Sequence, residues 1–345
     1  MIHVRRSPVE QPRIEATTFR GDSLRYLLDL SGRRILQLIP VMVGVSFLAF
    51  CLLNLLPGGT AIAILGDTAT NAQIAALNHK LGLDQPFWHR YGVWLWHVVH
   101  GNLGSSLITD QSVIHTVGQR LPTSLELITL GMILALSLAV PFAVLAARKP
   151  FGIIDWIGRG FSMCVLSVPN FVLALLLILF VAVKLHWLPA EGFTPLSAGL
   201  WPNLKTMILP AISTSFFLFA SYSRILRGDM IDQFNNEDYV LTARSKGLSE
   251  WRILFVHVLK NSLFSMITVV GTNFGVLVGG VVIVENIFGL PGMGQLLQSS
   301  IYNRDYTVVQ GEVVVIACAV VTMNLITDLS YLFLDPRVRY GSAGN

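Results

Sequence analysis

Charged side chains are scarce in this sequence. Lysine, arginine, aspartate and glutamate together make up 13% of the 345 residues, whereas hydrophobic residues make up 53%. Soluble globular domains carry about 25% charged residues, so this chain lacks the polar side chains that would cover a water-exposed surface. The shortage excludes a soluble enzyme, a nucleic-acid-binding protein and a secreted disulfide scaffold.

Motifs that signal catalysis or metal binding are also lacking. The three cysteines, Cys51, Cys164 and Cys318, lie in different apolar stretches and form no CxxC or Cys/His cluster. We therefore expect them to pack as small hydrophobic side chains. The chain contains no GxxxxGK[ST], HExxH or GxSxG motif. It has no P-loop of its own, and we expect no catalytic site, no bound metal and no directly bound cofactor.

Six long stretches of the chain contain no charged residue. No Asp, Glu, Lys or Arg occurs in residues 35–56, 127–147, 160–183, 206–223, 261–284 or 313–327. A helix needs about 20 apolar residues to cross the hydrocarbon core of a bilayer. We therefore predict an all-α polytopic membrane protein with six transmembrane helices, at about 35–56, 125–147, 160–183, 206–223, 263–286 and 308–334.

The basic residues predict how these spans are oriented. Eighteen of the 24 lysines and arginines lie in the N-terminal segment, in the loops after the second and fourth spans, and in the C-terminal tail. Because cytoplasmic segments carry the excess of Lys and Arg, we predict that both termini are cytoplasmic. The predicted parts are a cytoplasmic arm (1–30), a membrane domain (31–340) with an outer loop (57–124) and a cytoplasmic loop (224–260), and a tail (341–345).

Aromatic residues gather in the predicted outer loop. Phe87, Trp88, Tyr91, Trp94 and Trp96 all lie within 11 residues of Pro86. Such rings suit a membrane–water interface. A docking or substrate surface is the alternative interpretation.

The cytoplasmic loop has the pattern of two short helices joined by a glycine. Asp238 is placed to cap a helix over residues 239–246, Gly247 to end it in the left-handed conformation, and Ser249 to cap the next helix. This arrangement would present an apolar knob that fits a groove in another protein. An ordinary amphipathic loop beside the membrane is the alternative. The residues of the predicted knob are Val240, Leu241, Ala243 and Leu248.

This loop resembles the coupling loop of ABC-importer permeases, in the version found in dipeptide and oligopeptide permeases. The importer pattern is EAA, three residues, Gly, and a terminal IxLP, and in this sequence Ala243, Gly247 and Leu259 match it. The departures are Leu241 for the Glu, Thr242 for the first Ala, His257 for the Ile and Lys260 for the Pro. The peptide subfamily commonly departs in this way.

Further segments between about residues 30 and 340 resemble the same subfamily in the same order. They are residues 33–40, 81–86, 101–104, 120–126, 285–294, 304–306, 309–311 and 334–337. The arm before about residue 25 is an addition to the family pattern.

The resemblance implies a type I ABC-importer permease of the bacterial inner membrane without catalytic activity. Its expected partners are a second homologous permease, two ATPase subunits or one fused pair that bind ATP and Mg²⁺, an extracytoplasmic substrate-binding protein and membrane lipid, but no nucleic acid. The coupling loop would sit in an ATPase cleft, and closing of the ATPases on ATP would tilt spans 3–5 and open the pathway outward. The expected coupling residues are Asp238, Tyr239, Leu241, Thr242, Ala243, Arg244, Lys246, Gly247, Leu248 and Glu250.

Span 5 and its outer end supply the candidate pathway and gate residues. Its GxxxGxxxG ridge could be a sliding permease–permease interface, a pore lining or a site of static packing. Glu285 could bind a peptide's amino terminus, shape the outer gate or end the helix in water. We expect the two acidic residues of the sixth span, Glu312 and Asp328, to face the interior of the complex or an interface. The candidate set is Gly271, Asn273, Gly275, Gly279, Glu285, Asn286, Phe288, Pro291 and Gly292.

The sequence leaves two other classes of function to be considered. A secondary transporter or channel driven by an ion gradient would use the same six spans without ATPase partners, and an intramembrane enzyme would need a convergent catalytic set that the sequence lacks. The substrate is also open, because relatives of the resembled family carry dipeptides, longer peptides, glutathione or nickel complexes.

Overall fold

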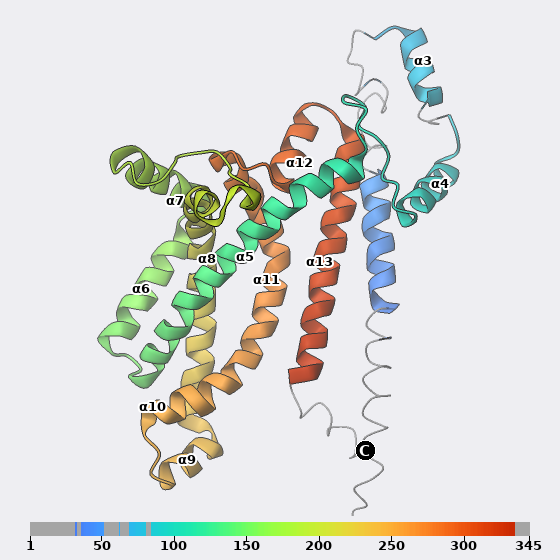
Figure 1. Ribbon diagram of the computed structural model, residues 1–345. Coiled ribbons are helices and arrows are strands. Elements are labelled where there is room, and N and C mark those ends of the chain that lie inside the picture. Colours follow the sequence, from blue (N-terminus) through green and yellow to red (C-terminus); the bar gives the residue numbers. More distant parts are fainter. Residues whose placement is uncertain (1–31, 33–35, 52–61, 63–68, 81–83, 335–345) are drawn as a thin grey trace, which may run out of the picture.

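The computed structural model describes residues 32, 36–51, 62, 69–80 and 84–334 (Figure 1). These residues form helices and connecting loops, and the strand-like pairing among them is one isolated antiparallel bridge between Ser105 and Ser112. The predicted all-helical fold is thus confirmed for the described part of the chain. The predicted N-terminal arm, the tail and most of residues 52–68 lie outside the described residues.

The helices follow one another along the chain, mostly through short connections. After an N-terminal helix Leu36–Cys51, they are α3 (Asn71–Lys80), α4 (Phe87–Val99), α5 (Val113–Arg148), α6 (Ile153–Ser167), α7 (Asn170–Leu177), α8 (Leu200–Asn236), α9 (Asp238–Ser245), α10 (Glu250–Arg252), α11 (Leu259–Phe288), α12 (Met293–Tyr302) and α13 (Tyr306–Leu334). Two π-helical segments, Ile178–Lys184 and Ile253–Val258, continue α7 and lead into α11.

Several of these helices are long and apolar enough to cross a membrane. Within the described residues they are α5, α8, the continuous segment Glu250–Phe288 and α13 up to Ser330, and α6 with α7 would add a fifth span as a bent pair. The helix Leu36–Cys51 is apolar but shorter. It lies in the first predicted span, whose residues 35 and 52–56 are outside the described part. The chain is therefore a polytopic helical membrane protein with four or five candidate spans in its described part.

The third predicted span, residues 160–183, is wrong as a single helix. α6 and α7 are bent by 101° at the break between Ser167 and Asn170. Pro169 explains the break, because proline lacks a backbone N–H and forces the residue before it into an extended conformation. Val168 accordingly has φ −100° and ψ 127°.

Three other helical segments are longer than the predicted spans. α5 begins at Val113 rather than 125, α8 covers Leu200–Asn236 rather than 206–223, and the fifth segment begins at Glu250. A helix of 36 residues is about 54 Å long, whereas the hydrocarbon core is about 30 Å thick. A charged residue ends an apolar stretch without ending a helix, so the predicted outer and cytoplasmic loops are partly helical.

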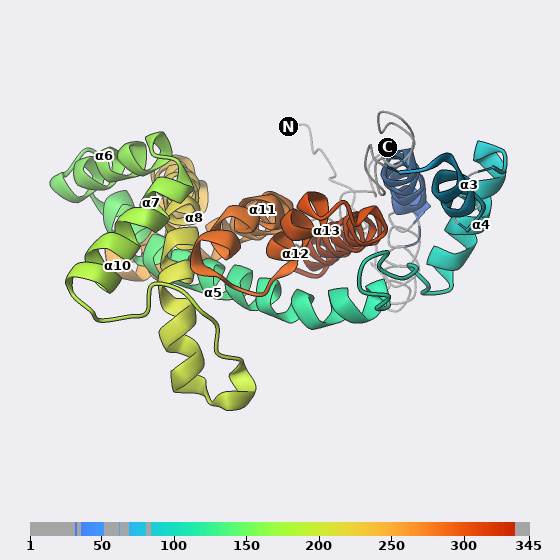
Figure 2. The same cartoon turned by 90° about the horizontal axis from the view of Figure 1, so that it is seen from above.

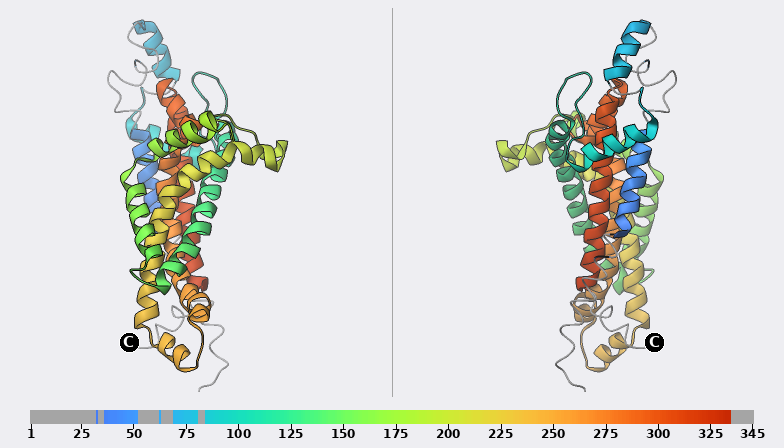
Figure 3. Two further views of the ribbon diagram at one scale, coloured as in Figure 1. Left: turned by 90° about the vertical axis from the view of Figure 1, so that its left-hand side faces the viewer. Right: turned by 90° about the vertical axis from the view of Figure 1, so that its right-hand side faces the viewer.

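The long helices stand in a row when viewed from above (Figure 2). α6, α7 and α8 lie at one end of the row, α11 and α13 in the middle, and the helix Leu36–Cys51 with α3 and α4 at the other end. α5 runs obliquely along this row and packs against α8. α9 and α10 lie at one end of the bundle axis, whereas α3, α4 and α12 lie at the opposite end (Figures 1 and 3). The predicted cytoplasmic and outer elements are thus separated by the length of the bundle.

The aromatic residues of α4 pack on the N-terminal helix. Phe47 stacks on Trp88, and Phe50 contacts Phe87 and Tyr91, with ring centroids between 5.4 and 5.8 Å apart. Much of the aromatic cluster therefore serves packing within the chain. The Trp88 and Trp96 rings stay about two-thirds exposed.

α5 and α8 form the most extensive helix–helix contact among the described elements. Small residues recur at every fourth position along α5 and form a ridge that consists of Gly131, Ala135, Ala139, Ala143 and Ala147. The four alanines are fully buried, and a Cβ added at Gly131 would lie 3.0 Å from Thr214 Cγ2 of α8. In lipid, such close van der Waals packing holds helices together, because hydrophobic burial offers little. This ridge was missed in the sequence, although its four-residue spacing is visible there.

The glycine ridge predicted in span 5 divides into two parts. A Cβ at Gly271 would overlap the Thr327 side chain of α13, and one at Gly275 would lie 3.2 Å from Val320 Cγ1 of the same helix. A Cβ at Gly279 would meet no atom within 4 Å. Gly271 and Gly275 therefore make tight packing inside the chain, and Gly279 stays open to a pathway or a partner.

We expect Gly271→Val to destabilise the chain by about 1–3 kcal/mol relative to Gly279→Val, because only the first substitution overpacks an interior contact. Both glycines lie inside α11, so their helix propensities cancel in the comparison. Thermal unfolding of the purified chain in detergent measures the difference. Equal stability of the two variants would contradict the packing of α11 on α13.

Candidate functional site

The helix α9 forms the tip of the molecule at one end of the bundle (Figure 1). It covers Asp238–Ser245, one residue earlier than predicted, and Glu237 rather than Asp238 takes the N-cap position. Neither side chain makes a capping hydrogen bond there. Asp238 instead contributes a negative charge to the first turn, where it interacts favourably with the helix dipole.

The two faces of α9 differ from the prediction. Val240 and Ala243 are 1% and 6% exposed and pack into the hydrophobic core with half-buried Tyr239 and Leu248, whereas Leu241 is 54% exposed. The predicted apolar knob is therefore wrong for Val240 and Ala243, because these residues attach α9 to the rest of the chain. The predicted coupling residues on the outward face are Asp238, Leu241, Thr242, Arg244, Lys246, Gly247 and Glu250, all exposed.

Gly247 turns the chain after α9. Its φ of 75° lies in the left-handed region that the sequence predicts for it, and the N–H of Leu248 bonds to the carbonyl of Ala243 at 3.2 Å. Ser249 takes the N-cap position of α10, without a capping hydrogen bond from its side chain. The elbow therefore has the predicted order of helix, glycine and helix.

Cation–π contacts hold both sides of the elbow. The Arg244 guanidinium lies 4.5 Å from the ring centroid of Phe234 at the end of α8, and the Arg148 guanidinium at the end of α5 lies 4.5 Å from the ring of Trp251. Arg148 also lies 4.0 Å from the Glu250 carboxylate. α9 and α10 are thus bound to both α8 and α5.

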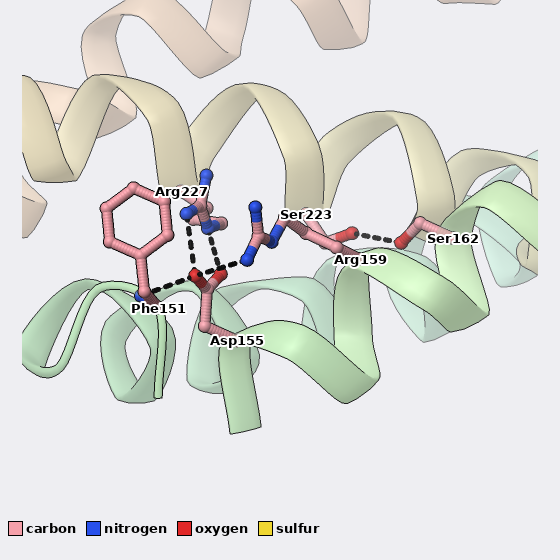
Figure 4. A network of polar contacts seen from close by, with 6 residues as sticks. All are labelled: Phe151, Asp155, Arg159, Ser162, Ser223 and Arg227. Carbon is pink, nitrogen blue, oxygen red and sulfur yellow. Dashed lines mark hydrogen bonds and ion pairs between the residues drawn. The ribbon is translucent and has the colours of Figure 1, made fainter. Parts of the chain in front are cut away.

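A buried ion pair joins α6 to α8 in the same half of the molecule (Figure 4). The Asp155 carboxylate is fully buried and receives hydrogen bonds from Nε and, at 2.8 Å, from a terminal nitrogen of Arg227. The backbone N–H of Phe151 donates to it at 2.8 Å, and a terminal nitrogen of Arg159 lies 3.6 Å away. This pair was not predicted from the sequence, because nothing in the spacing of Asp155 and Arg227 reveals that they meet.

At the opposite end, Glu285 anchors the first turn of α12. Its carboxylate is fully buried, accepts a hydrogen bond from Ser124 Oγ at 2.6 Å, and accepts from the N–H groups of Gly294 and Gln295 at 2.7 and 3.2 Å. Ser124 Oγ accepts the N–H of Met293 at 2.8 Å. These are N–H groups that no carbonyl of α12 can satisfy. The interpretation of Glu285 as a helix end facing water is therefore wrong.

The neighbouring candidate residues lie in or near the connection between α11 and α12. A Cβ at Gly292 would overlap the Glu285 carboxyl group, so the close approach requires glycine. Phe288 is buried in the core, and the Asn286 amide donates to the carbonyl of Val282 in its own helix at 2.7 Å. Pro291 is half-buried in the connection between α11 and α12. The structure thus brings Glu285, Phe288 and Gly292 together and leaves the Asn286 side chain outside this contact.

The remaining acidic and polar candidates lie elsewhere along the bundle. Glu312 of α13 is fully buried, as expected for an interior carboxyl group, and Asp328 is half-buried. Asn273 is half-buried on α11, near the fully buried Tyr222 of α8. Gly271 and Gly275 contact α13, as described above.

Segments that resemble the permease subfamily meet at the end of the bundle that contains α12. Ser106 Oγ donates to the Asp305 carboxylate, and the N–H of Leu107 bonds to the same group at 3.3 Å. A Cβ at Gly104 would lie 3.1 Å from Thr307, and one at Gly311 would lie 2.6 Å from Val113 Cγ1. Segments about 200 residues apart therefore pack together where α5 and α13 begin.

Family models match most of the chain. The model described as "Binding-protein-dependent transport system inner membrane component" matches residues 139–340, and the model of the N-terminal part of such membrane components matches residues 24–128. A probable peptide ABC transporter permease of Sinorhizobium fredii is 40% identical over 308 residues, which cover 89% of this chain and 98% of the relative. A dipeptide transport system permease of Escherichia coli is 33% identical, covering 91% and 99% of the two chains.

A solved structure shares the fold. The inward-facing methionine ABC transporter MetNI contains a chain that aligns with a TM-score of 0.52 at 14% sequence identity, covering 64% of this chain and 96% of that one. At this identity the likeness concerns the fold alone.

We expect Glu285→Ala to destabilise the chain by about 3 kcal/mol or more, because it leaves buried donors of Ser124, Gly294 and Gln295 without a partner. Asn286→Ala is the matched control, since its amide bonds only to its own helix. Thermal unfolding in detergent measures both variants. A Glu285→Ala variant of unchanged stability would contradict the anchoring role and favour direct contact with substrate.

For the ion pair, we expect Asp155→Ala to cost about 3–5 kcal/mol, because Arg227 loses its buried partner. The double variant Asp155→Ala/Arg227→Leu should be more stable than the sum of the single effects predicts, by at least about 1 kcal/mol. A double-mutant cycle of unfolding free energies measures this coupling. Strict additivity would show that the pair does not hold α6 to α8.

Proposed function

Because the chain belongs to the family of binding-protein-dependent transport system inner membrane components, we propose that it is the permease subunit of an ABC importer for peptides. The family match over residues 139–340 and the extent of similarity to peptide permeases carry this proposal. The subunit is not an enzyme. Partner proteins would hydrolyse ATP, and this chain would form part of the passage through the membrane.

An assembly of several proteins is part of the proposal. A component of this family works with an ATPase and a binding protein, and we propose a second homologous permease, two ATPase subunits or one fused pair that hold ATP and Mg²⁺, and a binding protein that docks at the end of α3, α4 and α12. Six spans with cytoplasmic termini would include a first span to which the helix Leu36–Cys51 belongs. The excess of Lys and Arg in the predicted cytoplasmic segments supports this orientation.

The outward face of α9 would be the surface that the ATPase moves. Leu241 and Thr242 are exposed at the tip, while Val240 and Ala243 are buried in the core. A push on α9 therefore acts on α8, which precedes it and is joined to it through Glu237. It also acts on α11, which follows the elbow. ATP-bound ATPases would favour one arrangement of these helices, which is the differential affinity that a switch requires.

The pathway would lie along the side of α11 that the chain leaves open. Gly279 has no neighbour at its Cβ position, and Val276 and Ile283 are 61% and 49% exposed. We propose that the second permease or the peptide approaches there. Glu285, Asn286, Phe288, Pro291 and Gly292 would shape the outer end of this side, and Asn273 would add a polar group in its middle.

The proposal predicts that Leu241→Arg, in the assembled complex, lowers peptide uptake by at least about tenfold, because it places a charge at the centre of the ATPase contact. Asn235→Arg is the control, since Asn235 is also exposed but lies in the last turn of α8. Uptake and ATP hydrolysis in proteoliposomes measure the effect. Normal uptake by Leu241→Arg would contradict the coupling role of α9, and uptake by the purified chain without ATPases would favour a secondary transporter.

A further inference from the structure

Gln233 lies where three helices of the cytoplasmic half meet. It belongs to the last turn of α8, and its side-chain oxygen accepts a hydrogen bond from the Tyr239 hydroxyl of α9 at 2.8 Å. Its side-chain nitrogen donates to Ser262 Oγ of α11 at 3.1 Å and to the Asp229 carboxylate at 2.8 Å. One side chain therefore bonds to α8, α9 and α11 at the same time.

The chemistry of this position demands an amide. A glutamine side chain carries two N–H donors and an acceptor oxygen, and here both donors and the oxygen have partners. Glutamate has the same shape but no N–H when ionised, and it would face the Asp229 carboxylate with a like charge. Leucine would leave the Tyr239 hydroxyl and Ser262 without this partner.

The hydrogen bonds of Gln233 are partly shielded from water. Ser262 is 1% exposed, and Gln233 and Tyr239 are half-buried. Hydrogen bonds shielded from water hold their geometry better than exposed ones, because water does not compete for the same groups. Arg244 of α9 also contacts α8, through a hydrogen bond to the carbonyl of Phe234 at 3.5 Å and through the ring of Phe234.

We propose that Gln233 is the positioning residue that makes α8, α9 and α11 move together when an ATPase pushes on α9. Without it, α9 remains joined to α8 by the chain, by apolar contacts and by Arg244, whose contacts with Phe234 do not include α11. With it, the end of α8 and the beginning of α11 follow the same displacement. The inference rests on the proposed coupling function of α9 and names the residue that carries the movement beyond α9.

The complex of both permeases, the ATPases and the binding protein, reconstituted in proteoliposomes, tests this with radiolabelled alanine di-, tri- and pentapeptides. Peptide import and ATP hydrolysis are measured together, and their ratio is the readout. We expect Gln233→Glu to raise the ATP consumed per peptide by about fivefold, because repulsion from the Asp229 carboxylate moves the new carboxylate away from Tyr239 and Ser262. About fivefold is the change that the net loss of one hydrogen bond makes in an equilibrium. A purely structural defect would lower import and hydrolysis in the same proportion.

A matched control lies one turn away. The Asn236 amide donates to the Asp232 carboxylate at 2.9 Å, four residues earlier in α8, but both groups are exposed and the bond stays within one helix. Asn236→Asp therefore makes the same change of amide to acid beside a carboxylate. We expect it to leave the ratio within about twofold of the wild type, as surface substitutions do.

A reversal of the donor and the acceptor completes the test. In the double variant Gln233→Glu/Asp229→Asn, the new amide at 229 can donate to the new carboxylate at 233, which also accepts from Tyr239 and Ser262. We expect this variant to regain a near wild-type ratio. A Gln233→Glu ratio equal to the wild type, or a double variant without recovery, would overturn the inference. A wild-type complex that imports none of the three peptides with ATP would instead overturn the proposed function.

Discussion

The close contact between α5 and α8 is the interaction on which the other features depend. The ridge of small residues from Gly131 to Ala147 lets the two backbones approach, and lipid offers little other force to hold them. α8 continues through the single residue Glu237 into α9. The helix that leads to the candidate coupling surface is therefore also the one most extensively packed in the bundle, so a movement of α9 reaches α8 and α5 directly.

Buried carboxylates fix the two ends of this arrangement. Asp155 joins α6 to α8 in the half that contains α9, and Glu285 joins α11, α12 and α5 at the opposite end. Breaking the Asp155 ion pair would leave a buried charge without its partner, at a cost of several kcal/mol. Removing the Glu285 carboxyl group would leave buried donors unsatisfied, so each carboxyl group holds its helices in one relative position. Between these ends α11 packs closely on α13 at Gly271 and Gly275. The helices are thus joined by polar groups at both ends of the bundle and by close packing in its middle.

The sequence predicts the class of fold well, because the hydrocarbon core imposes long stretches without charge. It predicts the lengths of helices poorly, since the 36-residue α5 extends beyond the membrane without a change in helical pattern. It also misses the corner at Pro169, because the run of apolar residues on both sides looks continuous. At the elbow, Gly247 could be predicted from its place between two helical patterns. The inward orientation of Val240 could not, because it depends on how α9 folds back onto α8 and the segment Ile253–Val258.

Glu285 shows why a site needs the folded chain. From the sequence, a carboxyl group near the predicted outer end of a span could face water, contact substrate or shape a gate. Its role is decided by its hydrogen-bond partners, which are the N–H groups of Gly294 and Gln295 and the side chain of Ser124, 161 residues earlier. Those partners also restrict its motion. Because Gly292 leaves no room for a side chain and the Glu285 carboxyl group bonds to both α5 and α12, the connection between α11 and α12 cannot open without breaking these buried hydrogen bonds. We therefore expect this connection to move as one unit with α5, rather than about a hinge at Gly292.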